Sequence, residues 1–172
     1  MPRNIEIKAR LADIAATTER AAALSTEGPT PIAQDDTFFR CDTGRLKLRA
    51  FSANDGELIF YRRGHQAGPK ESFYVRSPTS HVATLRESLT LAYGQVGRVV
   101  KQRTLFIVGR TRVHLDRVQG LGEFLELEVV LRDDESTDAG VAEAHALMAE
   151  LGVGADQLVA RAYVDLLRDQ ED

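Results

Sequence analysis

The sequence predicts an α+β protein in which about eight β-strands form an antiparallel sheet and helices pack on one side of it. Two observations predict this class. Polar and apolar side chains alternate in eight segments, which is typical of strands with two different faces. Four other segments have helical character, and the links between several strand-like segments are too short for parallel crossovers.

The strand-like segments begin near the N-terminus and continue to residue 132. Asn54-Asp55-Gly56 is typical of a tight hairpin, and Gly28-Pro29 predicts a turn before the second strand. Short links of this kind make successive strands antiparallel neighbours. The predicted strands cover residues 3–11, 34–40, 45–51, 57–63, 71–76, 98–108, 110–116 and 123–132.

The remaining segments predict helices. Thr79 or Ser80 and Ser136 can cap helix N-termini, and Gly152 can end a helix. No long linker divides the chain, so we expect one domain over residues 1–172. The predicted helices cover residues 12–26, 79–93, 136–151 and 155–168.

Composition excludes several classes of protein. The chain has 172 residues, is 43% hydrophobic and has a net charge of −4. This charge argues against nucleic-acid binding through bulk positive charge, so an anionic ligand must meet a local cationic patch. The chain has neither an apolar run of about 20 residues nor a signal-peptide core, and we expect a cytoplasmic protein without a membrane partner. Cys41 is the only cysteine, which excludes an internal disulfide.

Five predicted strands have a polar face as regular as their apolar face. In the first strand Glu6 and Lys8 alternate with Ile5 and Ile7. Like charges on neighbouring strands destabilise a sheet unless an anion lies among them. The cations on these faces are Lys8, Arg45, Lys47, Arg49, Lys101, Arg103, Arg110 and Arg112.

Two interpretations of these faces remain open. An open sheet could expose its charged face to water and need no ligand, although solubility alone favours interspersed signs. Alternatively, about eight strands can close into a barrel that holds one small ligand. The polar faces then point inward, and the helices cover the apolar faces outside.

A few carboxylates lie among these cations: Glu6, Asp116, Glu126 and Glu128. Oxygen ligands of this kind suit Mg²⁺ or Mn²⁺, which bind proteins through one or two carboxylates together with substrate phosphates. Cations for phosphate oxygens and carboxylates for a metal are the components of a phosphoryl-transfer site. His114 lies on the same face, where assistance in proton transfer is one interpretation and a hydrogen-bonded structural histidine is the favoured one.

Taken in their order along the chain, these charged residues and their neighbours resemble the motifs of the CYTH superfamily, also called triphosphate tunnel metalloenzymes. The superfamily includes class IV adenylyl cyclases, thiamine triphosphatases and inorganic triphosphatases. Its N-terminal hallmark is an E-x-E-x-K strand, and here Asn4 stands in place of the first glutamate, followed by Glu6 and Lys8. The other similar segments are residues 34–39, 45–49, 101–103, 112–116, 120–122, 126–128 and 162–167.

The resemblance implies a closed antiparallel β-tunnel, formed by a single CYTH-like domain, that holds a triphosphate with Mg²⁺ or Mn²⁺. Arg62 is added to the phosphate ligands because it follows Leu58 and Phe60 at strand spacing. By position, the implied metal ligands are Glu6, Asp116, Glu126 and Glu128. The implied catalytic residues are Glu6, Lys8, Glu126 and Glu128. The implied phosphate ligands are Lys8, Lys47, Arg49, Arg62, Lys101, Arg103 and Arg112.

Three functions follow from the resemblance. The first is a metal-dependent triphosphatase. The second is an adenylyl cyclase that makes cyclic AMP and pyrophosphate from ATP. The third is a triphosphate-binding module without turnover, which the Asn4 replacement favours. We expect the ligand to be ATP, thiamine triphosphate or tripolyphosphate, and the protein to be a monomer or homodimer.

Overall fold

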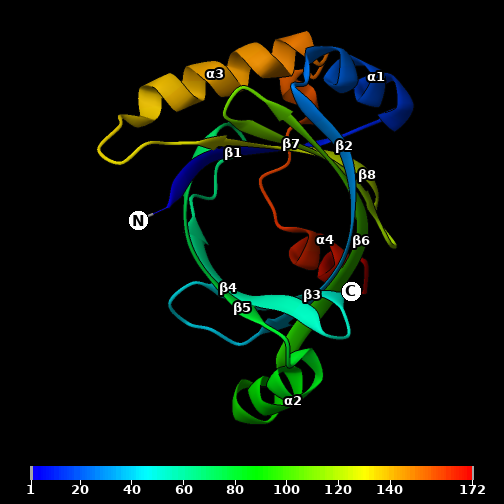
Figure 1. Cartoon of the computed structure of the whole chain (residues 1–172), viewed down its shortest axis with the longest axis vertical. Coiled ribbons are helices and arrows are strands. Elements are labelled where there is room, and N and C mark those ends of the chain that lie inside the picture. The colour runs from blue at the N-terminus through cyan, green and yellow to red at the C-terminus, as the bar shows by residue number, and fades with distance from the viewer. Residues whose placement is uncertain (1, 172) are drawn as a thin grey trace.

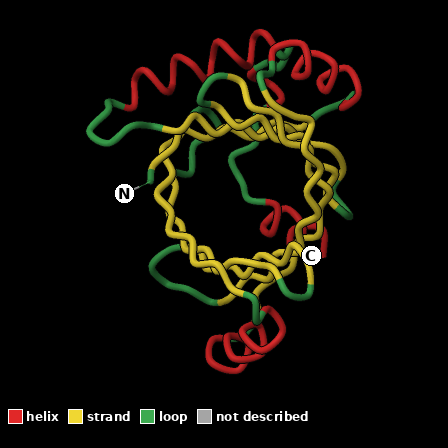
Figure 2. Tube along the Cα trace, viewed as in Figure 1, coloured by secondary structure: helices red, strands yellow, loops and turns green. Residues whose placement is uncertain are grey.

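Eight antiparallel strands close into a ring in the computed structural model, which describes residues 2–171 (Figures 1 and 2). The order around the ring is β1-β5-β4-β3-β2-β6-β7-β8, and β1 pairs with both β5 and β8. This closure confirms the predicted α+β barrel. The strands are β1 (Arg3–Arg10), β2 (Glu27–Phe39), β3 (Arg45–Ser52), β4 (Asp55–Arg63), β5 (Lys70–Thr79), β6 (Gln95–Val108), β7 (Thr111–Val118) and β8 (Gly122–Val130).

The helices lie at three places around the ring (Figure 1). α1 (Ile14–Leu24) and α3 (Thr137–Glu150) pack outside, against β6 and β7 and against β1 and β8 respectively. α2 (Val82–Tyr93) packs outside β2, β3 and β4. α4 (Tyr163–Glu171) lies within the outline of the ring in this view. Within residues 2–171, none of the helices has the length and apolarity needed to cross a membrane.

β2 is longer than predicted. It begins at Glu27 and includes Gly28-Pro29, which we had interpreted as a turn. The register with β6 shifts between Glu27 and Thr30, and pairing then continues without interruption to Phe38. A bulge of this kind absorbs an irregular stretch of backbone without ending the strand. The prolines there cannot donate a hydrogen bond, so the sequence resembles a loop.

The predicted helix over residues 155–168 is correct only for residues 163–168. Ala155–Gln157 form a short 3₁₀ turn, and α4 begins only at Tyr163. Between them Leu158 forms a β-bridge with Ala9, and the Val159 N–H donates to the carbonyl of Lys8. The backbone of this segment is therefore hydrogen-bonded to β1 instead of to a helix. Likewise, α2 begins at Val82 and not at residue 79, since β5 extends to Thr79.

The main apolar core lies outside the ring. Ile5, Ala9 and Leu125 pack there beneath Leu147 and Met148 of α3. A second apolar cluster lies where α4 meets the strands: Phe38, Val99, Val118, Phe124, Ala162, Tyr163 and Val164. Apolar burial therefore stabilises the barrel from its outer face and at one end, and leaves the interior for charged groups.

Candidate active site

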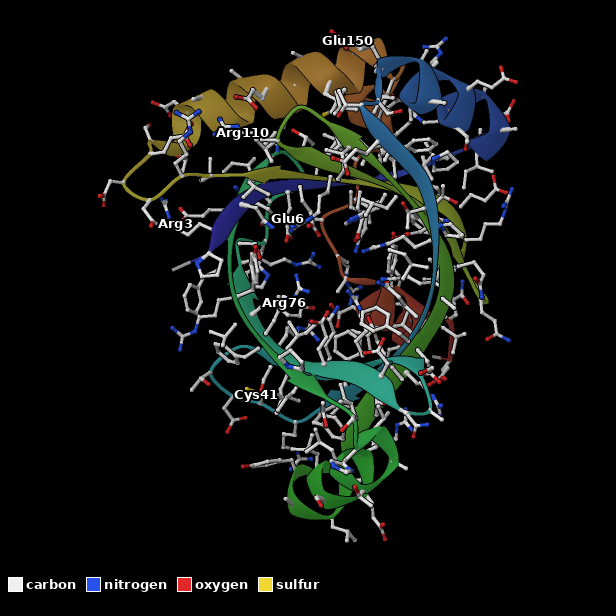
Figure 3. The ribbon with its side chains drawn as sticks, in the orientation of Figure 1. Arg3, Glu6, Cys41, Arg76, Arg110 and Glu150 are labelled. Carbon is white, nitrogen blue, oxygen red and sulfur yellow. The ribbon has the colours of Figure 1, made fainter. Side chains whose placement is uncertain are left out.

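One cavity occupies the interior of the barrel, and all eight strands contribute side chains to its wall. Figure 3 shows Glu6 and Arg76 within the ring and Arg110 and Glu150 outside it. The charged side chains that occupy alternate positions along their strands therefore face one inner surface. The predicted site residues that line the cavity are Glu6, Lys8, Lys47, Arg49, Lys101, Arg103, Arg112, Glu126 and Glu128.

The cavity wall is predominantly cationic. Among the described residues, nine Lys and Arg side chains and five carboxylates line it. The wall also includes Arg63, Lys70 and Arg76, which were not among the predicted site residues, although each follows the inward phase of its strand. A buried excess of positive charge is unfavourable in the empty protein and favours an anionic ligand.

Asp36 of β2 lies among three of these cations, two from β3 and one from β6. Its carboxylate accepts hydrogen bonds from Arg49 Nε and Nη2 at 2.8 Å and from Lys47 Nζ at 3.2 Å, and Lys101 Nζ lies 4.0 Å away. Burial opposes ionisation of Asp36, but Arg49 and Lys47 hold its pKa well below the usual range. Burial, followed by the charge of Arg103, lowers the pKa of Lys101 to about 7. We call Asp36, Lys47, Arg49 and Lys101 the cationic cluster.

The carboxylates lie mainly on the opposite wall, on β1 and β8. Glu128 is paired across the strands with Glu6 and with Arg112, whose guanidinium donates to it at 2.6 and 2.8 Å. Burial, and then the charge of Glu128, raises the pKa of Glu6 to about 7. Although burial opposes it, the pKa of Glu128 is lowered to about 2 by His114, which is protonated at the low pH where Glu128 titrates, and by Arg112. Two carboxyls of one wall thus differ widely in proton affinity.

Glu126 is held by two cations of the cavity wall. Arg103 Nη2 donates to its Oε2 at 2.5 Å, and Lys8 Nζ lies 3.4 Å from its Oε1. Burial raises the pKa of Glu126, but Lys8 and Arg103 together hold it well below the usual range. Glu126 is therefore ionised and available as an oxygen ligand.

His114, Glu126 and Glu128 form a group suited to a metal ion. One ligand atom from each lies within 4.8 Å of the others. His114 is 5% exposed, and its Nδ1 has no hydrogen-bond partner among the described residues, contrary to a hydrogen-bonded structural role. Burial lowers the pKa of His114 to about 4, so at neutral pH its imidazole is uncharged and can ligate a cation. These donors fit a divalent cation.

Asp116 does not line the cavity, although we predicted it as a metal ligand. It is fully buried and accepts two hydrogen bonds from Arg103 at 2.7 Å and one from the Tyr163 hydroxyl at 2.9 Å. Its oxygens are therefore engaged in fixing Arg103. A metal-binding pattern read from alternation cannot distinguish a carboxylate covered by its neighbours from an accessible one.

Arg62 lies outside the barrel, so its prediction as a phosphate ligand is not supported by its position. Its Nε donates to the carbonyl of Thr43 at 2.7 Å. It shares the phase of Leu58, which packs in the apolar cluster beneath α2. The next residue, Arg63, faces the cavity and lies 3.6 Å from Glu6.

Asn4 and Gln34 are buried amides in the cavity wall. They are 1% and 4% exposed, and neither Asn4 Oδ1 nor Gln34 Oε1 has a hydrogen-bond partner among the described residues. Asn4 occupies the place where the E-x-E-x-K hallmark has a carboxylate. It lies next to Ser72 of β5 and contributes no charge to the carboxylate-bearing wall of β1 and β8.

The segment that leads into α4 lines part of the cavity. Lys8 Nζ donates to the carbonyl of Arg161 and Lys70 Nζ to the carbonyl of Ala160, both at 3.1 Å. Lys8 Nζ also lies 3.9 Å from the centroid of the Tyr163 ring. In Figure 2 the same segment crosses the interior of the ring before α4.

Comparison with known proteins agrees with this geometry. A family model described as the CYTH domain matches residues 2–163. The chain belongs to the CYTH family. CYTH enzymes are adenylate cyclases or triphosphatases, which bind triphosphate substrates and depend on a metal.

One curated CYTH relative is adenylate cyclase CyaB of Aeromonas hydrophila. It is 29% identical over 168 residues, which cover 92% of this chain and 85% of the relative. Among solved structures, the PH1012 protein of Pyrococcus horikoshii OT3 has a TM-score of 0.84 at 18% identity, covering 95% of this chain and 99% of its own. HpAC1 of Hippeastrum has a TM-score of 0.67 at 14% identity, covering 99% and 96%, and is described as having a dominant triphosphatase activity. At these identities the two structures show a shared fold.

Proposed function

We propose that this protein binds a triphosphate-containing small molecule inside the barrel and, with Mg²⁺ or Mn²⁺, hydrolyses it. The observation that carries the proposal is the convergence of nine Lys and Arg side chains and the His114–Glu126–Glu128 group on one cavity. Phosphoryl transfer requires cations for the phosphate oxygens and ligands for a hard metal ion. Membership of the CYTH family and the activity described for HpAC1 support hydrolysis.

In this proposal the cationic cluster binds the phosphates. Arg49 offers a planar fork that matches phosphate oxygens, and Lys47 and Lys101 act as point charges. Arg103 adds a further guanidinium whose orientation is fixed by buried Asp116. Because these groups are held by Asp36 and Asp116 before the ligand arrives, little of the binding energy is spent on ordering them.

His114, Glu126 and Glu128 hold the divalent cation, with Glu6 beside them across the β1–β8 pair. A divalent cation bound there supplies positive charge to the phosphate oxygens as negative charge develops on them. Glu6, with a pKa of about 7, accepts a proton from water near neutral pH and orients that water toward the terminal phosphate. Glu6, Lys8, Glu126 and Glu128 are thus the groups assigned to catalysis.

A class IV adenylyl cyclase is the second candidate, and the CyaB relative favours it. In that reaction the ribose 3′-hydroxyl attacks the α-phosphorus and pyrophosphate leaves, and the same cations and metal ligands serve. Binding without turnover is the third candidate, since Asn4 supplies no charge where the family hallmark has a carboxylate.

Product analysis separates the three candidates. The protein is incubated with Mg²⁺ or Mn²⁺ and with ATP, thiamine triphosphate or tripolyphosphate, and the products are separated by ion exchange. We expect orthophosphate. Cyclic AMP with pyrophosphate would support the cyclase, and binding without product would support the third candidate. Failure of all three compounds to bind would refute the proposal.

Substitution of the metal ligands tests their role. Glu126→Gln and Glu128→Gln each keep the shape of the side chain but remove its charge, and we expect at least about a tenfold loss of turnover without loss of fold. Glu150→Gln is the matched control, because Glu150 lies on the exposed surface of α3. Full turnover in EDTA, or in the double variant, would remove the metal from the mechanism.

A further inference from the structure

A second pocket lies next to the segment that leads into α4. Its volume is about 480 Å³, which is in the range of pockets that bind small molecules. Tyr61, Arg63 and Ala162 line both this pocket and the barrel cavity, so the two adjoin at these residues. We call it the second pocket.

Positive charge predominates in the second pocket, although the chain as a whole has a net charge of −4. Among the described residues, four arginines and two carboxylates line it. The arginines come from β3, from β4 and from the segment before α4, so three separate parts of the fold create the excess. A local excess of this kind attracts an anion. The arginines are Arg45, Arg62, Arg63 and Arg161, and the carboxylates are Asp42 and Asp165.

The guanidinium of Arg62 is the most available of these cations. Its Nε donates to the carbonyl of Thr43 at 2.7 Å, but within residues 2–171 its two terminal nitrogens have no hydrogen-bond partner and no carboxylate forms an ion pair with it. In contrast, Arg45 pairs with Asp165 at 2.6 Å, and Arg161 pairs with Asp169. A ligand in the second pocket can therefore bind the free end of Arg62 without displacing an internal partner.

The fold orients Arg62 before a ligand arrives. A Cβ at Gly44 would lie 2.8 Å from the Phe60 ring and from the carbonyl of Tyr61, so a glycine lets the loop before β3 lie close to β4. The Thr43 carbonyl is thereby placed to accept from Arg62 Nε, and Arg62 Cζ lies 5.3 Å from the centroid of the Phe60 ring. A guanidinium held in this way loses less entropy when it binds an anion.

The segment before α4 separates the second pocket from the barrel cavity. The carbonyls of Ala160 and Arg161 accept hydrogen bonds from Lys70 and Lys8, which line the barrel cavity. The same two residues, Ala160 and Arg161, line the second pocket. An anion in the second pocket is thus held apart from the cationic cluster, and both pockets can be occupied at once.

We propose that the second pocket is an anion site that binds a phosphate group, with Arg62 as its main donor and Arg45 and Arg161 beside it. The planar fork of a guanidinium matches two phosphate oxygens, which a single ammonium group does not. Free orthophosphate and a small phosphate monoester share this chemistry. The site does not depend on the proposed function; where that function operates, the orthophosphate released in the barrel is a ligand close at hand.

Titration with orthophosphate in EDTA tests the proposal in the absence of turnover. One molar equivalent of tripolyphosphate first occupies the barrel, and the Nε–H resonances of the arginine side chains are followed in ¹H–¹⁵N spectra. We expect the Arg62 resonance to shift until it saturates, whereas sodium chloride at the same ionic strength leaves it unchanged. A parallel titration with glycerol 3-phosphate identifies the source of the phosphate group: the tighter ligand shows whether the pocket selects free orthophosphate or a monoester.

Substitutions assign the binding to Arg62, with affinity measured by calorimetry. Arg62→Gln removes the charge of an exposed side chain, and we expect at least about tenfold weaker orthophosphate binding while tripolyphosphate binding stays unchanged. Arg62→Lys keeps the charge but not the fork, and it should lose only part of the affinity. Arg117→Gln is the matched control and should bind as the wild type does, because Arg117 is exposed on β7 and lines neither pocket.

The outcomes separate this site from the proposed function. Orthophosphate that binds only when tripolyphosphate is absent, or that binds Arg62→Gln as tightly as the wild type, would overturn the second site and leave the triphosphate site in place. If tripolyphosphate does not bind at all, the proposed function fails. The second site is then decided by orthophosphate alone, whose binding should still depend on Arg62.

Discussion

At the scale of single residues, Asp116 and Glu126 both accept hydrogen bonds from the guanidinium of Arg103. Asp116 is fully buried and also accepts from Tyr163, whereas Glu126 faces the cavity. The two carboxylates therefore have separable tasks. Asp116 fixes Arg103 within the fold, and Glu126 is the group that a ligand can reach.

Asp116→Asn should accordingly lower the free energy of unfolding by about 3–5 kcal/mol, because it leaves Arg103 buried with half of its ion pairing removed. Urea denaturation monitored by circular dichroism measures this loss. Glu128→Gln is the comparison, since Glu128 pairs with Arg112, which is less buried, and it should cost less than half as much. An Asp116→Asn variant as stable as the wild type would return Asp116 to the candidate metal ligands.

The lowered pKa values of the lysines in the cavity predict how triphosphate binding depends on pH. Burial lowers the pKa of Lys8 and Lys70 to about 8 and that of Lys101 to about 7, so part of this charge is absent at pH 8. A triphosphate favours the charged forms, and its binding at pH 8 should therefore take up protons. Affinity should fall as pH rises from 7 to 9, in the sense expected for cations whose pKa the ligand raises.

Calorimetry of tripolyphosphate binding in two buffers of different ionisation enthalpy measures the proton uptake. Lys101→Met should reduce it, because Lys101 is the lysine with the lowest pKa of the three. Binding that exchanges no protons between pH 7 and 9 would show that the lysines are already fully charged in the empty cavity.

The alternation of side chains correctly predicted that most site residues face inward, but it could not predict the orientation or the contacts of all of them. Arg62 was assigned from its spacing to Leu58, whose face turned out to be the outer one. Lys70 lies one residue before the predicted strand 71–76, so its phase was not considered. The sequence pattern predicted His114 on the polar, inward face. Its proximity to Glu126 and Glu128 and the lack of a hydrogen-bond partner for its Nδ1 depend on the pairing of β7 with β8.

At the scale of elements, α4 packs closely against the barrel because β6 has a glycine, Gly97, at the contact. A Cβ at Gly97 would overlap Cγ2 of Val164, the second residue of α4. Gly97→Val should therefore displace α4 and destabilise the fold by about 1–3 kcal/mol. Hydrogen exchange of residues 163–171 should accelerate while the amides of β1 and β8 keep their protection.

Gly68→Val is the control for this change, since a Cβ at Gly68 meets no atom within 4 Å and Gly68 lies in the loop before β5. If hydrogen exchange in α4 is the same in both variants, the packing of Val164 on β6 does not hold the helix in place.

The periodicity of the sequence predicted the strands and three of the helices, but it did not predict the structure of two segments. Residues 27–33 contain Pro29 and Pro31, and only their register with β6 shows that they form a strand. Residues 158–162 had helical character, yet Leu158 and Val159 pair with Ala9 and Lys8 of β1, a partner distant in sequence. Local pattern does not contain this information, because long-range pairing overrides helix propensity.

At the scale of the whole molecule, the chain is acidic but its interior is cationic. The net charge is −4, while nine Lys and Arg side chains face five carboxylates in the cavity among the described residues. The proposed ligand relieves this internal repulsion, so tripolyphosphate should raise the melting temperature. At 100 times Kd the gain in unfolding free energy is about 2.7 kcal/mol.

Scanning fluorimetry with and without tripolyphosphate measures the gain. It should shrink in 1 M NaCl, where charges are screened within about 3 Å, although groups buried in the cavity are screened less than surface ones. Sodium sulfate at the same ionic strength is the control for a general salt effect. A melting temperature that does not respond to tripolyphosphate at low salt would contradict an anion-binding interior.

β1 is the strand that shuts the ring, since it pairs with β5 on one side and with β8 on the other. Glu6 therefore lies beside Glu128, and Lys8 beside Glu126, only when β1 pairs with β8. During synthesis β1 can pair with β5 once residue 79 has been made, but its second partner, β8, exists only after residue 130 has been made. A chain that ends before β8 thus lacks Glu126 and Glu128, and a ligand that contacts both β1 and β8 would bind complete molecules in preference to incomplete ones.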